Sequence, residues 1–237
     1  MTEGFDASAF DGYTTLVKIS LPSNMTIIPK YCFRKCANLT TVTNWDKIKV
    51  ISLEAFMECV KFNPSVLPST LEEIHDNAFK ACTALSLNTL PDGLKKIGVA
   101  AFRQSNVTFS EWPSAIEEIG GRAFCITPVT FTTWPENIPT MQPGVFINCY
   151  KITKFTVPAS VTAIGGAVFR MDQGVKRDIY MCSKTPISTI VDTAEGGNNS
   201  DNPFGSSKTD LLVKISQRFT SQHPVRAFMK QHLIGRT

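Results

Sequence analysis

Phenylalanine recurs along the chain at a nearly constant interval, and this feature limits the possible folds more than any other. The residue before each of these phenylalanines is small or of modest size. Apolar residues stand eight and five positions before the ring in all seven complete copies. A fixed period of this length is typical of a solenoid, in which each coil buries its apolar face on its neighbours. The eight phenylalanines, spaced by 22 or 23 residues, are Phe10, Phe33, Phe56, Phe79, Phe102, Phe124, Phe146 and Phe169.

The coil that ends at Phe169 shows how the chain is expected to turn. An apolar L-x-x-L-x-L pattern over residues 152–157 predicts a short strand, and Pro158 ends it because proline has no amide hydrogen for a sheet. A second short extended segment follows, and Gly165 allows a corner. Residues 167–169 are predicted to form one helical or 3₁₀ turn that carries the ring into the core. Coils stacked at ~4.8 Å bring successive rings within the ~4.5–7 Å of offset stacking.

Charged doublets test this register independently of hydrophobicity. Acidic and basic doublets alternate seven and six positions before successive rings, as Glu72-Glu73, Lys95-Lys96 and Glu117-Glu118, with Lys49 one coil earlier. Stacking places acid beside base on adjacent strands, which stabilises the array by about 0.2–1 kcal/mol per pair. We interpret this ladder as a register-fixing feature on a solvated face; the alternative is that it contacts a partner.

Composition bounds the class of protein. Hydrophobic residues make up 43% of the chain, which is enough for a continuous core. Residues 1–169 carry 14 Lys or Arg against 14 Asp or Glu, whereas residues 170–237 carry 10 against 6. The repeats are therefore neutral, and no long basic stripe indicates nucleic-acid binding. No apolar run approaches the ~18 residues of a membrane span. Phe10 belongs to a coil whose first half is missing, so we expect the sequence to be part of a longer chain.

The period breaks after Phe169, which predicts two units: a solenoid over residues 1–169 and a capping unit over residues 170–237. Within the cap, residues 179–181 and 211–215 have strand patterns, and a Gly/Asn/Asp-rich insertion lies near 192–202. Phe204 would be a ninth rung beyond that insertion, and residues 225–229 would form a short amphipathic helix. An array needs such a terminal unit with a polar outer face.

The recurring motif L-P-x-x-L-x-x-I-x-x-x-A-F-x-x-C resembles the BspA-like leucine-rich repeat. One copy runs from Leu67-Pro68 through Leu71, Ile74, Ala78 and Phe79 to Cys82. The resemblance implies an α/β leucine-rich-repeat solenoid, a right-handed superhelix of about eight coils with short strands and a C-terminal cap. It also implies a secreted or cell-surface protein with a recognition or adhesion role. No catalytic residue is carried over, because the repeat motif contains none.

Four of the seven cysteines occupy one repeat position, three residues after a ring: Cys36, Cys59, Cys82 and Cys149. Free cysteine packs as a small buried hydrophobe, so we expect buried thiols at this position. Neighbouring coils would also bring these Cα atoms within disulfide range. A disulfide or a metal site therefore remains an alternative, although no C-x-x-C pair occurs.

Other candidates for chemistry are sparse. His75 occupies the corner position at which other coils carry glycine, and no triad or H-E-x-x-H pattern surrounds it. It is expected to be solvated. Asp192, Glu195 and Asp201 could hold calcium, but their spacing matches no calcium-loop motif, and a flexible loop is the simpler interpretation. The sequence thus indicates no cofactor, no metal and no catalytic site.

The middle position of the L-x-x-L-x-L pattern becomes polar in three coils, and the residue before it becomes a large apolar one. These three apolar residues are Leu87, Phe109 and Phe131. Either the strand shifts locally and the three side chains fill the core, or they form an exposed apolar stripe that binds a partner. They are the candidate partner-binding residues, and their burial decides between the two alternatives.

We therefore predict a non-enzymatic binding or adhesion module outside the cell, which engages a protein or glycan through the sheet face of the repeats. The alternative is a spacer segment of a larger surface protein with no ligand of its own. An enzyme would need a deep pocket with convergent titratable groups, and the sequence shows no sign of one.

Overall fold

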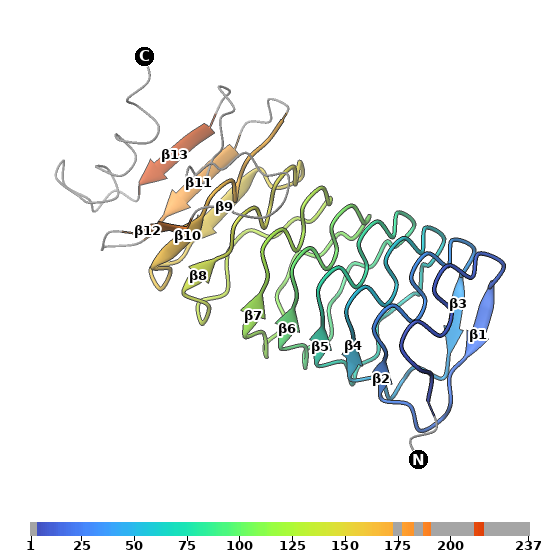
Figure 1. Cartoon of the computed structure of the whole chain (residues 1–237). Helices are drawn as coiled ribbons and strands as arrows, with labels where there is room; N and C mark the ends of the chain where they lie inside the picture. The colour runs from blue at the N-terminus through green and yellow to red at the C-terminus, as the bar shows by residue number, and fades with distance from the viewer. Residues whose placement is uncertain (1–3, 173–176, 183–186, 191–210, 216–237) are drawn as a thin grey trace.

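The computed structural model describes residues 4–172, 177–182, 187–190 and 211–215. In these residues the chain winds as a β-solenoid whose coils stack along one axis from the N-terminal end (Figure 1). The solenoid predicted from the phenylalanine period is confirmed. Most of the predicted capping unit, with the insertion near 192–202, the ninth ring Phe204 and the helix at 225–229, lies outside the described residues. The domain boundary at residue 169 stays a prediction.

In the seven coils from Phe33 to Phe169, one edge carries a short strand that ends five residues, or in one coil four residues, before the ring. These strands and one that follows Phe169 pair in parallel between neighbouring coils, except at one break, and they form one five-stranded and one three-stranded sheet. The first sheet contains β2 (Ile27–Ile28), β4 (Val50–Ile51), β5 (Glu73–Ile74), β6 (Lys96–Ile97) and β7 (Glu118–Ile119). The second contains β8 (Thr140–Met141), β10 (Ala163–Gly165) and β12 (Ser188–Ile190). The second residue of each strand in the first sheet is a buried isoleucine, and the residue before it points outward.

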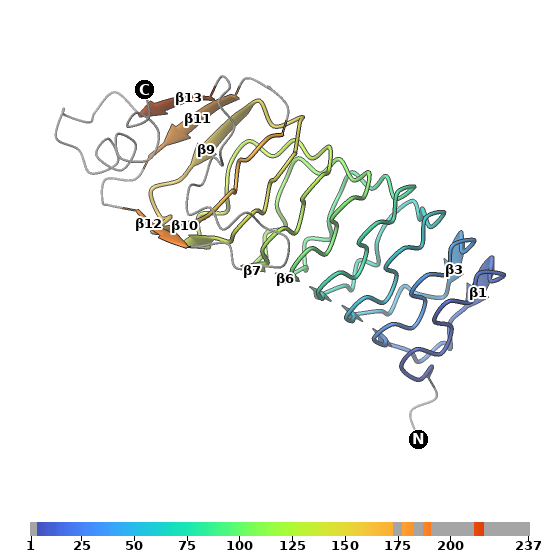
Figure 2. The ribbon, with the colours of Figure 1, turned by 45° about the horizontal axis from the view of Figure 1, so that its top comes forward.

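The opposite edge of the solenoid carries the strands of the L-x-x-L-x-L pattern (Figures 1 and 2). A two-stranded sheet of β1 (Lys18–Ser20) and β3 (Thr41–Thr43) lies at the N-terminal end. A three-stranded sheet of β9 (Lys154–Val157), β11 (Arg177–Met181) and β13 (Leu211–Ile215) lies at the C-terminal end. The strands predicted at 179–181 and 211–215 are thus confirmed. Between the two sheets, the equivalent segments of the middle coils form no strand.

The eight rings share one interior line, as the period predicted. Each ring stacks on the next, with centroids 5.2–6.2 Å apart and interplanar angles of 6–26°. These distances fall within the range of offset aromatic stacking. Phe33 to Phe146 are fully buried, whereas Phe10 at the N-terminal end is only partly buried. The ladder is therefore a continuous core that weakens at its end.

The turn around each ring is not the helical or 3₁₀ turn that was expected, and no helix occurs in the described residues. At Phe33, the amides of Tyr31, Phe33 and Lys35 donate to carbonyls of the next coil. The amides between them donate within the turn. The residues two before and two after the rings, apart from Met171, have positive φ, from 52° to 72°, which a right-handed helix does not allow. Each turn is thus bonded alternately to itself and to its neighbour.

The thiol position supports the ladder from one side. Cys36, Cys59, Cys82 and Cys149 each donate from Sγ to the carbonyl oxygen of the ring residue one coil earlier, at 2.9–3.0 Å. All seven cysteines are free, and all but Cys182 are buried. The prediction of buried free thiols is confirmed. Burial raises the pKa of the Cys149 thiol to about 12, so the thiols are protonated and inert near neutral pH.

Candidate functional site

The three candidate partner-binding residues are buried. Leu87 is 3%, Phe109 0% and Phe131 1% exposed. The exposed apolar stripe is therefore wrong, and the alternative, in which the three side chains fill the core, is correct. Side chains of an extended chain alternate between its two faces, so a shift of one residue turns these three inward. The two phenylalanine rings fill the core: Phe109 packs edge-on against Phe102, and Phe131 packs edge-on against Phe124.

The same shift turns a set of small polar residues outward, which we call the polar platform. Its six members lie on three successive coils, and all are exposed: Ser86, Asn88, Thr108, Ser110, Thr130 and Thr132. Backbone hydrogen bonds hold the coils in place beneath it. Thr108 donates to the Leu87 carbonyl and Thr130 to the Phe109 carbonyl, each at 2.8 Å. The polar platform is thus a rigid surface of hydroxyl and amide groups.

Trp112 borders the polar platform and is only partly buried. Its ring stacks on Phe131 with centroids 3.7 Å apart and an interplanar angle of 3°. Its Nε1–H donates to the Thr133 carbonyl at 2.7 Å. These two contacts fix the indole next to the hydroxyl groups. Trp112 stands where the repeat motif has the leucine before proline. Nothing in that motif says how far a side chain at this position reaches the surface.

A second surface lies on the outer side of β4 to β7, and we call it the charged strip: Lys49, Glu72, Glu73, Lys95, Lys96, Glu117 and Glu118. The parallel register places Glu73 beside Lys96 and Lys96 beside Glu118. Ion pairs link Glu72 to Lys49 at 3.1 Å and to Lys95 at 3.2 Å. Another links Lys96 to Glu118 at 2.9 Å. The charge ladder predicted from the doublets is therefore confirmed, and its ion pairs link adjacent coils.

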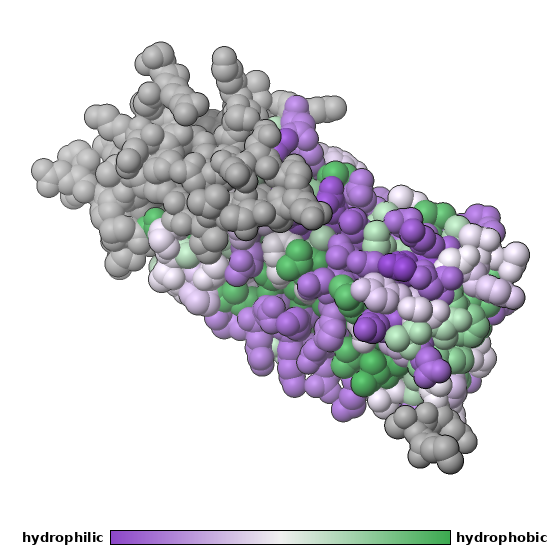
Figure 3. Space-filling model, viewed as in Figure 1, coloured by the Kyte–Doolittle hydropathy of each residue, from purple (hydrophilic) through white to green (hydrophobic). Residues whose placement is uncertain are grey.

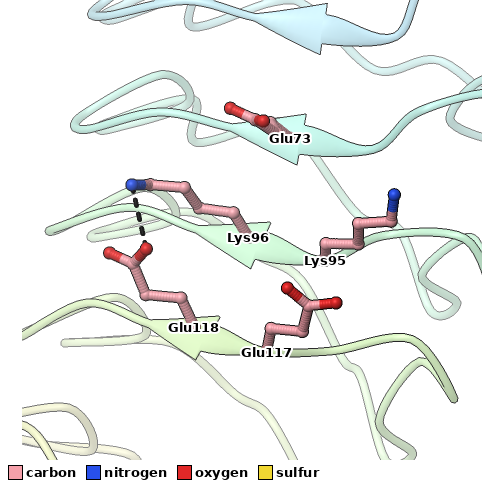
Figure 4. A pocket seen from close by; sticks show the side chains of 5 residues that line it. All are labelled: Glu73, Lys95, Lys96, Glu117 and Glu118. Atoms are coloured by element: carbon pink, nitrogen blue, oxygen red, sulfur yellow. Dashed lines mark ion pairs between the residues drawn. The ribbon is translucent and has the colours of Figure 1, made fainter.

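The charged strip contains a shallow, open hollow lined by Glu73, Lys95, Lys96, Glu117 and Glu118 (Figure 4). The Lys96–Glu118 pair closes one side of it, and Lys95 and Glu117 lie on the other. Hydrophilic side chains dominate the surface around this part of the solenoid (Figure 3). Hydrogen bonds from Lys49 and Lys95 lower the pKa of Glu72, and the hydrogen bond with Glu118 raises the pKa of Lys96. Both groups therefore stay charged over a wide pH range. The doublets predicted the ladder but not the hollow.

The remaining candidates from the sequence are His75 and the three carboxylates of the insertion near 192–202. The His75 ring is partly exposed, as expected, and its Nε2 lies 2.7 Å from a carboxylate oxygen of Glu73. Asp192, Glu195 and Asp201 lie outside the described residues. In the described part of the chain, no three His, Cys, Asp or Glu side chains are grouped in a way that could hold a metal ion.

The repeat geometry agrees with comparisons to known proteins. The model of the BspA type leucine rich repeat region matches residues 2–63 and 49–176, in six copies. The chain belongs to this family. The match spans the coils from the first ring to the last, so the polar platform and the charged strip both lie on BspA-type repeats. No curated protein matches the chain.

Solved bacterial structures are similar to these BspA-type repeats. A leucine rich cell surface protein from Faecalibacterium prausnitzii A2-165 is 20% identical, with a TM-score of 0.54, over 75% of this chain and 57% of that protein. The T. pallidum leucine rich repeat protein is 26% identical, with a TM-score of 0.46, over 69% and 66%. A leucine-rich repeat protein from Bacteroides ovatus ATCC 8483 is 20% identical, with a TM-score of 0.47, over 89% and 65%. The chain thus corresponds to 57–66% of the length of these proteins.

Nowhere in the described ranges does a helix reach the length and hydropathy needed to cross a bilayer.

Proposed function

We propose that this BspA-type repeat protein is a non-enzymatic binding module at the cell surface, and that it engages a protein or glycan partner through the polar platform. The observation that carries the proposal is the alternation in the middle coils, where six exposed polar residues alternate with three buried apolar ones. The partner is thus expected on the face predicted from the sequence, but on the outward residues rather than on Leu87, Phe109 and Phe131.

The chemistry of the polar platform favours a neutral glycan as the partner. Threonine and serine hydroxyls both donate and accept hydrogen bonds, and the Asn88 amide adds two donors and an acceptor. Threonine is restricted at χ1, so ordering it on binding has a low entropic cost. Trp112 adds a partly exposed aromatic edge beside these groups, and aromatic rings with polar neighbours are typical of ligand-binding surfaces.

Three further observations support the location and the lack of catalysis. The repeat motif carries no catalytic residue. The hollow in the charged strip is shallow and open, unlike the deep pockets that enclose small substrates. The F. prausnitzii protein of similar fold is a cell surface protein by its name.

The second candidate is a spacer within a longer surface protein. It is favoured by the burial of Leu87, Phe109 and Phe131, because the face that they leave behind is polar and lacks an exposed apolar stripe. A spacer needs only a rigid, solvated array, and the ring ladder provides one.

Binding of the purified chain to a glycan array and to a panel of mucosal proteins tests the proposal. The test variant replaces Asn88, Thr108 and Thr130 by Ala, because these side chains are exposed and their removal leaves the core intact. The matched control replaces Thr26, Thr140 and Thr162, on the opposite edge of the coils, by Ala.

We expect binding that the test variant weakens by at least about tenfold, equivalent to one or two hydrogen bonds, and that the control variant retains. Binding to a protein alone would select a protein partner over a glycan. No binding in either library, or equal binding by both variants, would favour the spacer.

A further inference from the structure

We propose that two copies of this chain associate face to face through the charged strip, in antiparallel orientation. The inference does not depend on the polar platform, which lies on the opposite edge of the coils. It starts from the order of charges along the solenoid axis. The adjacent strands β4, β5, β6 and β7 carry, in turn, a positive, a negative, a positive and a negative band.

This order of charges is self-complementary under a two-fold rotation. The two-fold axis runs parallel to the strands, in the plane of the interface, and passes between β5 and β6. It places β5 of one copy over β6 of the other, and β4 over β7. The acidic band of Glu72 and Glu73 then faces the basic band of Lys95 and Lys96. Lys49 faces the acidic band of Glu117 and Glu118. Every band meets its opposite, which is the condition for an isologous interface between identical chains.

The same pattern excludes neighbouring registers. If the second copy slides by one coil, the acidic band on β5 faces itself, and the basic band on β6 faces Lys49. Like charges then oppose each other along the interface, which is the kind of repulsion that sets specificity. One antiparallel register is therefore favoured over the registers on either side of it.

The side chains are placed to make these contacts. They project from a continuous five-stranded sheet, whose backbone register is fixed by parallel pairing. Their exposures range from 35% for Lys96 to 58% for Glu118, so their charged ends reach solvent. The carboxylate of Glu73 contacts His75 rather than a lysine.

Because the contacts are exposed ion pairs, the dimer is expected to be weak and sensitive to salt. Sedimentation velocity of the full chain at about 100 µM protein should show a dimer at about 50 mM salt that dissociates at about 500 mM salt. A wild-type chain that stays monomeric at low salt would overturn the proposal.

Paired charge reversals test the geometry. Variant A carries Lys95→Glu and Lys96→Glu, and variant B carries Glu72→Lys and Glu73→Lys. In a homodimer of variant A, the bands on β5 and β6 that face each other would both be acidic. In a homodimer of variant B they would both be basic, so each variant alone should be monomeric. In an equimolar mixture every band again meets its opposite. The mixture should therefore form a 1:1 heterodimer, with circular dichroism confirming that each variant is folded.

A control separates this register from general attraction between oppositely charged proteins. Lys30→Glu with Lys35→Glu changes the net charge as variant A does, but both lysines lie outside the charged strip. This control chain mixed with variant B should not form a heterodimer, and alone it should dimerise as the wild type does. A folded A–B mixture that stays monomeric, or a wild-type dimer that variants A and B leave intact, would overturn the proposal.

Discussion

The ring ladder differs between its two halves. From Phe10 to Phe102, successive centroids lie 5.2–5.5 Å apart. From Phe102 to Phe169, they lie 5.8–6.2 Å apart. The repeat motif is the same in both halves, so the motif itself does not set the spacing.

Side chains added to the core account for the difference. In the first half, Phe62 lies parallel to Phe56, with centroids 4.7 Å apart at 2°, and so extends the stack. In the second half, Phe109 meets Phe102 at 76° and Phe131 meets Phe124 at 66°. Edge-on rings need more room along the axis than parallel ones. The five-stranded sheet also ends in this half, since β7 does not pair with β8.

Two of the three coils in the second half are also one residue shorter. The 22-residue coils that begin at Phe102 and Phe124 carry Ser105 and Thr127 at the position three after the ring. Their hydroxyls donate to their own ring residue's carbonyl at 2.7 Å. In the 23-residue coils with cysteine, the thiol reaches the preceding coil instead. The side chain three residues after the ring thus donates its hydrogen bond within its own coil when it is a serine or threonine. It donates to the preceding coil when it is a cysteine.

The largest expected effect tests the tighter half. Phe79→Ala removes a fully buried ring between two stacked neighbours and should lower the free energy of unfolding by about 3–5 kcal/mol. Phe10→Ala should cost less than half as much, because Phe10 is only partly buried at the end of the ladder. Urea unfolding of both variants measures the ratio. Equal losses would mean that the ladder is not the core of the array.

The next effect concerns the thiols and alkaline pH. Burial raises the pKa of Cys149 to about 12 and that of Cys36 to about 11, from an ordinary value of 9.0. Above pH 9 the unfolded chain releases these protons while the folded chain keeps them. Stability is therefore fully present below pH 9 and is lost as pH rises towards the folded values. Each thiol contributes a slope of about 1.4 kcal/mol per pH unit.

Cys149→Ser should reduce that slope by one thiol's share, in chemical denaturation between about pH 9 and pH 11. Ser105→Cys should add a thiol to a short coil and increase the slope if the new side chain is buried as its neighbours are. An unchanged slope in Cys149→Ser would show that this thiol ionises in the folded chain as it does in the unfolded one.

Two adjacent glycines after β7 face different neighbours: Gly120 faces the preceding coil, and Gly121 faces the next coil, across the break between β7 and β8. A Cβ on Gly120 would lie 2.4 Å from the Val99 amide nitrogen, which is backbone of the preceding coil. A Cβ on Gly121 would meet the Pro143 carbonyl oxygen at 3.0 Å. Gly120→Ala should therefore cost about 1–3 kcal/mol, and Gly121→Ala less. Thermal unfolding compares the two; the control Gly93→Ala, where a Cβ meets nothing within 4 Å, should be near neutral. A larger loss for Gly121→Ala would reverse the assignment of the tight side.

The smallest expected effect is a gain. Ile126 has a φ of 60°, which is unfavourable for a β-branched residue, and its side chain is 41% exposed. Ile126→Gly should raise the free energy of unfolding by up to about 1 kcal/mol, because the strain removed exceeds the apolar burial lost. A matched Gly12→Ile, at the equivalent position of the first coil, should lower it. Both are measured by urea unfolding, and a loss in Ile126→Gly would mean that its contacts outweigh the strain.

Much of the fold could be predicted from the sequence, because the same few positions repeat in every coil. The ring ladder, the buried thiols and the register of Glu72, Lys95 and Lys96 followed from the period alone. The helical turn predicted around each ring is wrong. A small residue before a ring does not reveal the positive φ of residues such as Glu54 and Ala100. The candidate site was only half predicted: the face was identified, but its outward residues were not.

The sequence by itself determined that the coils stack and in which register, because a slip of one residue between coils would take the rings out of line and separate charges of opposite sign. Only the tertiary structure decided that Leu87, Phe109 and Phe131 point inward. The physical reason is that side-chain direction in an extended segment depends on a one-residue shift, and that shift is set by packing against coils more than 20 residues away in the chain. The polar platform exists for the same reason.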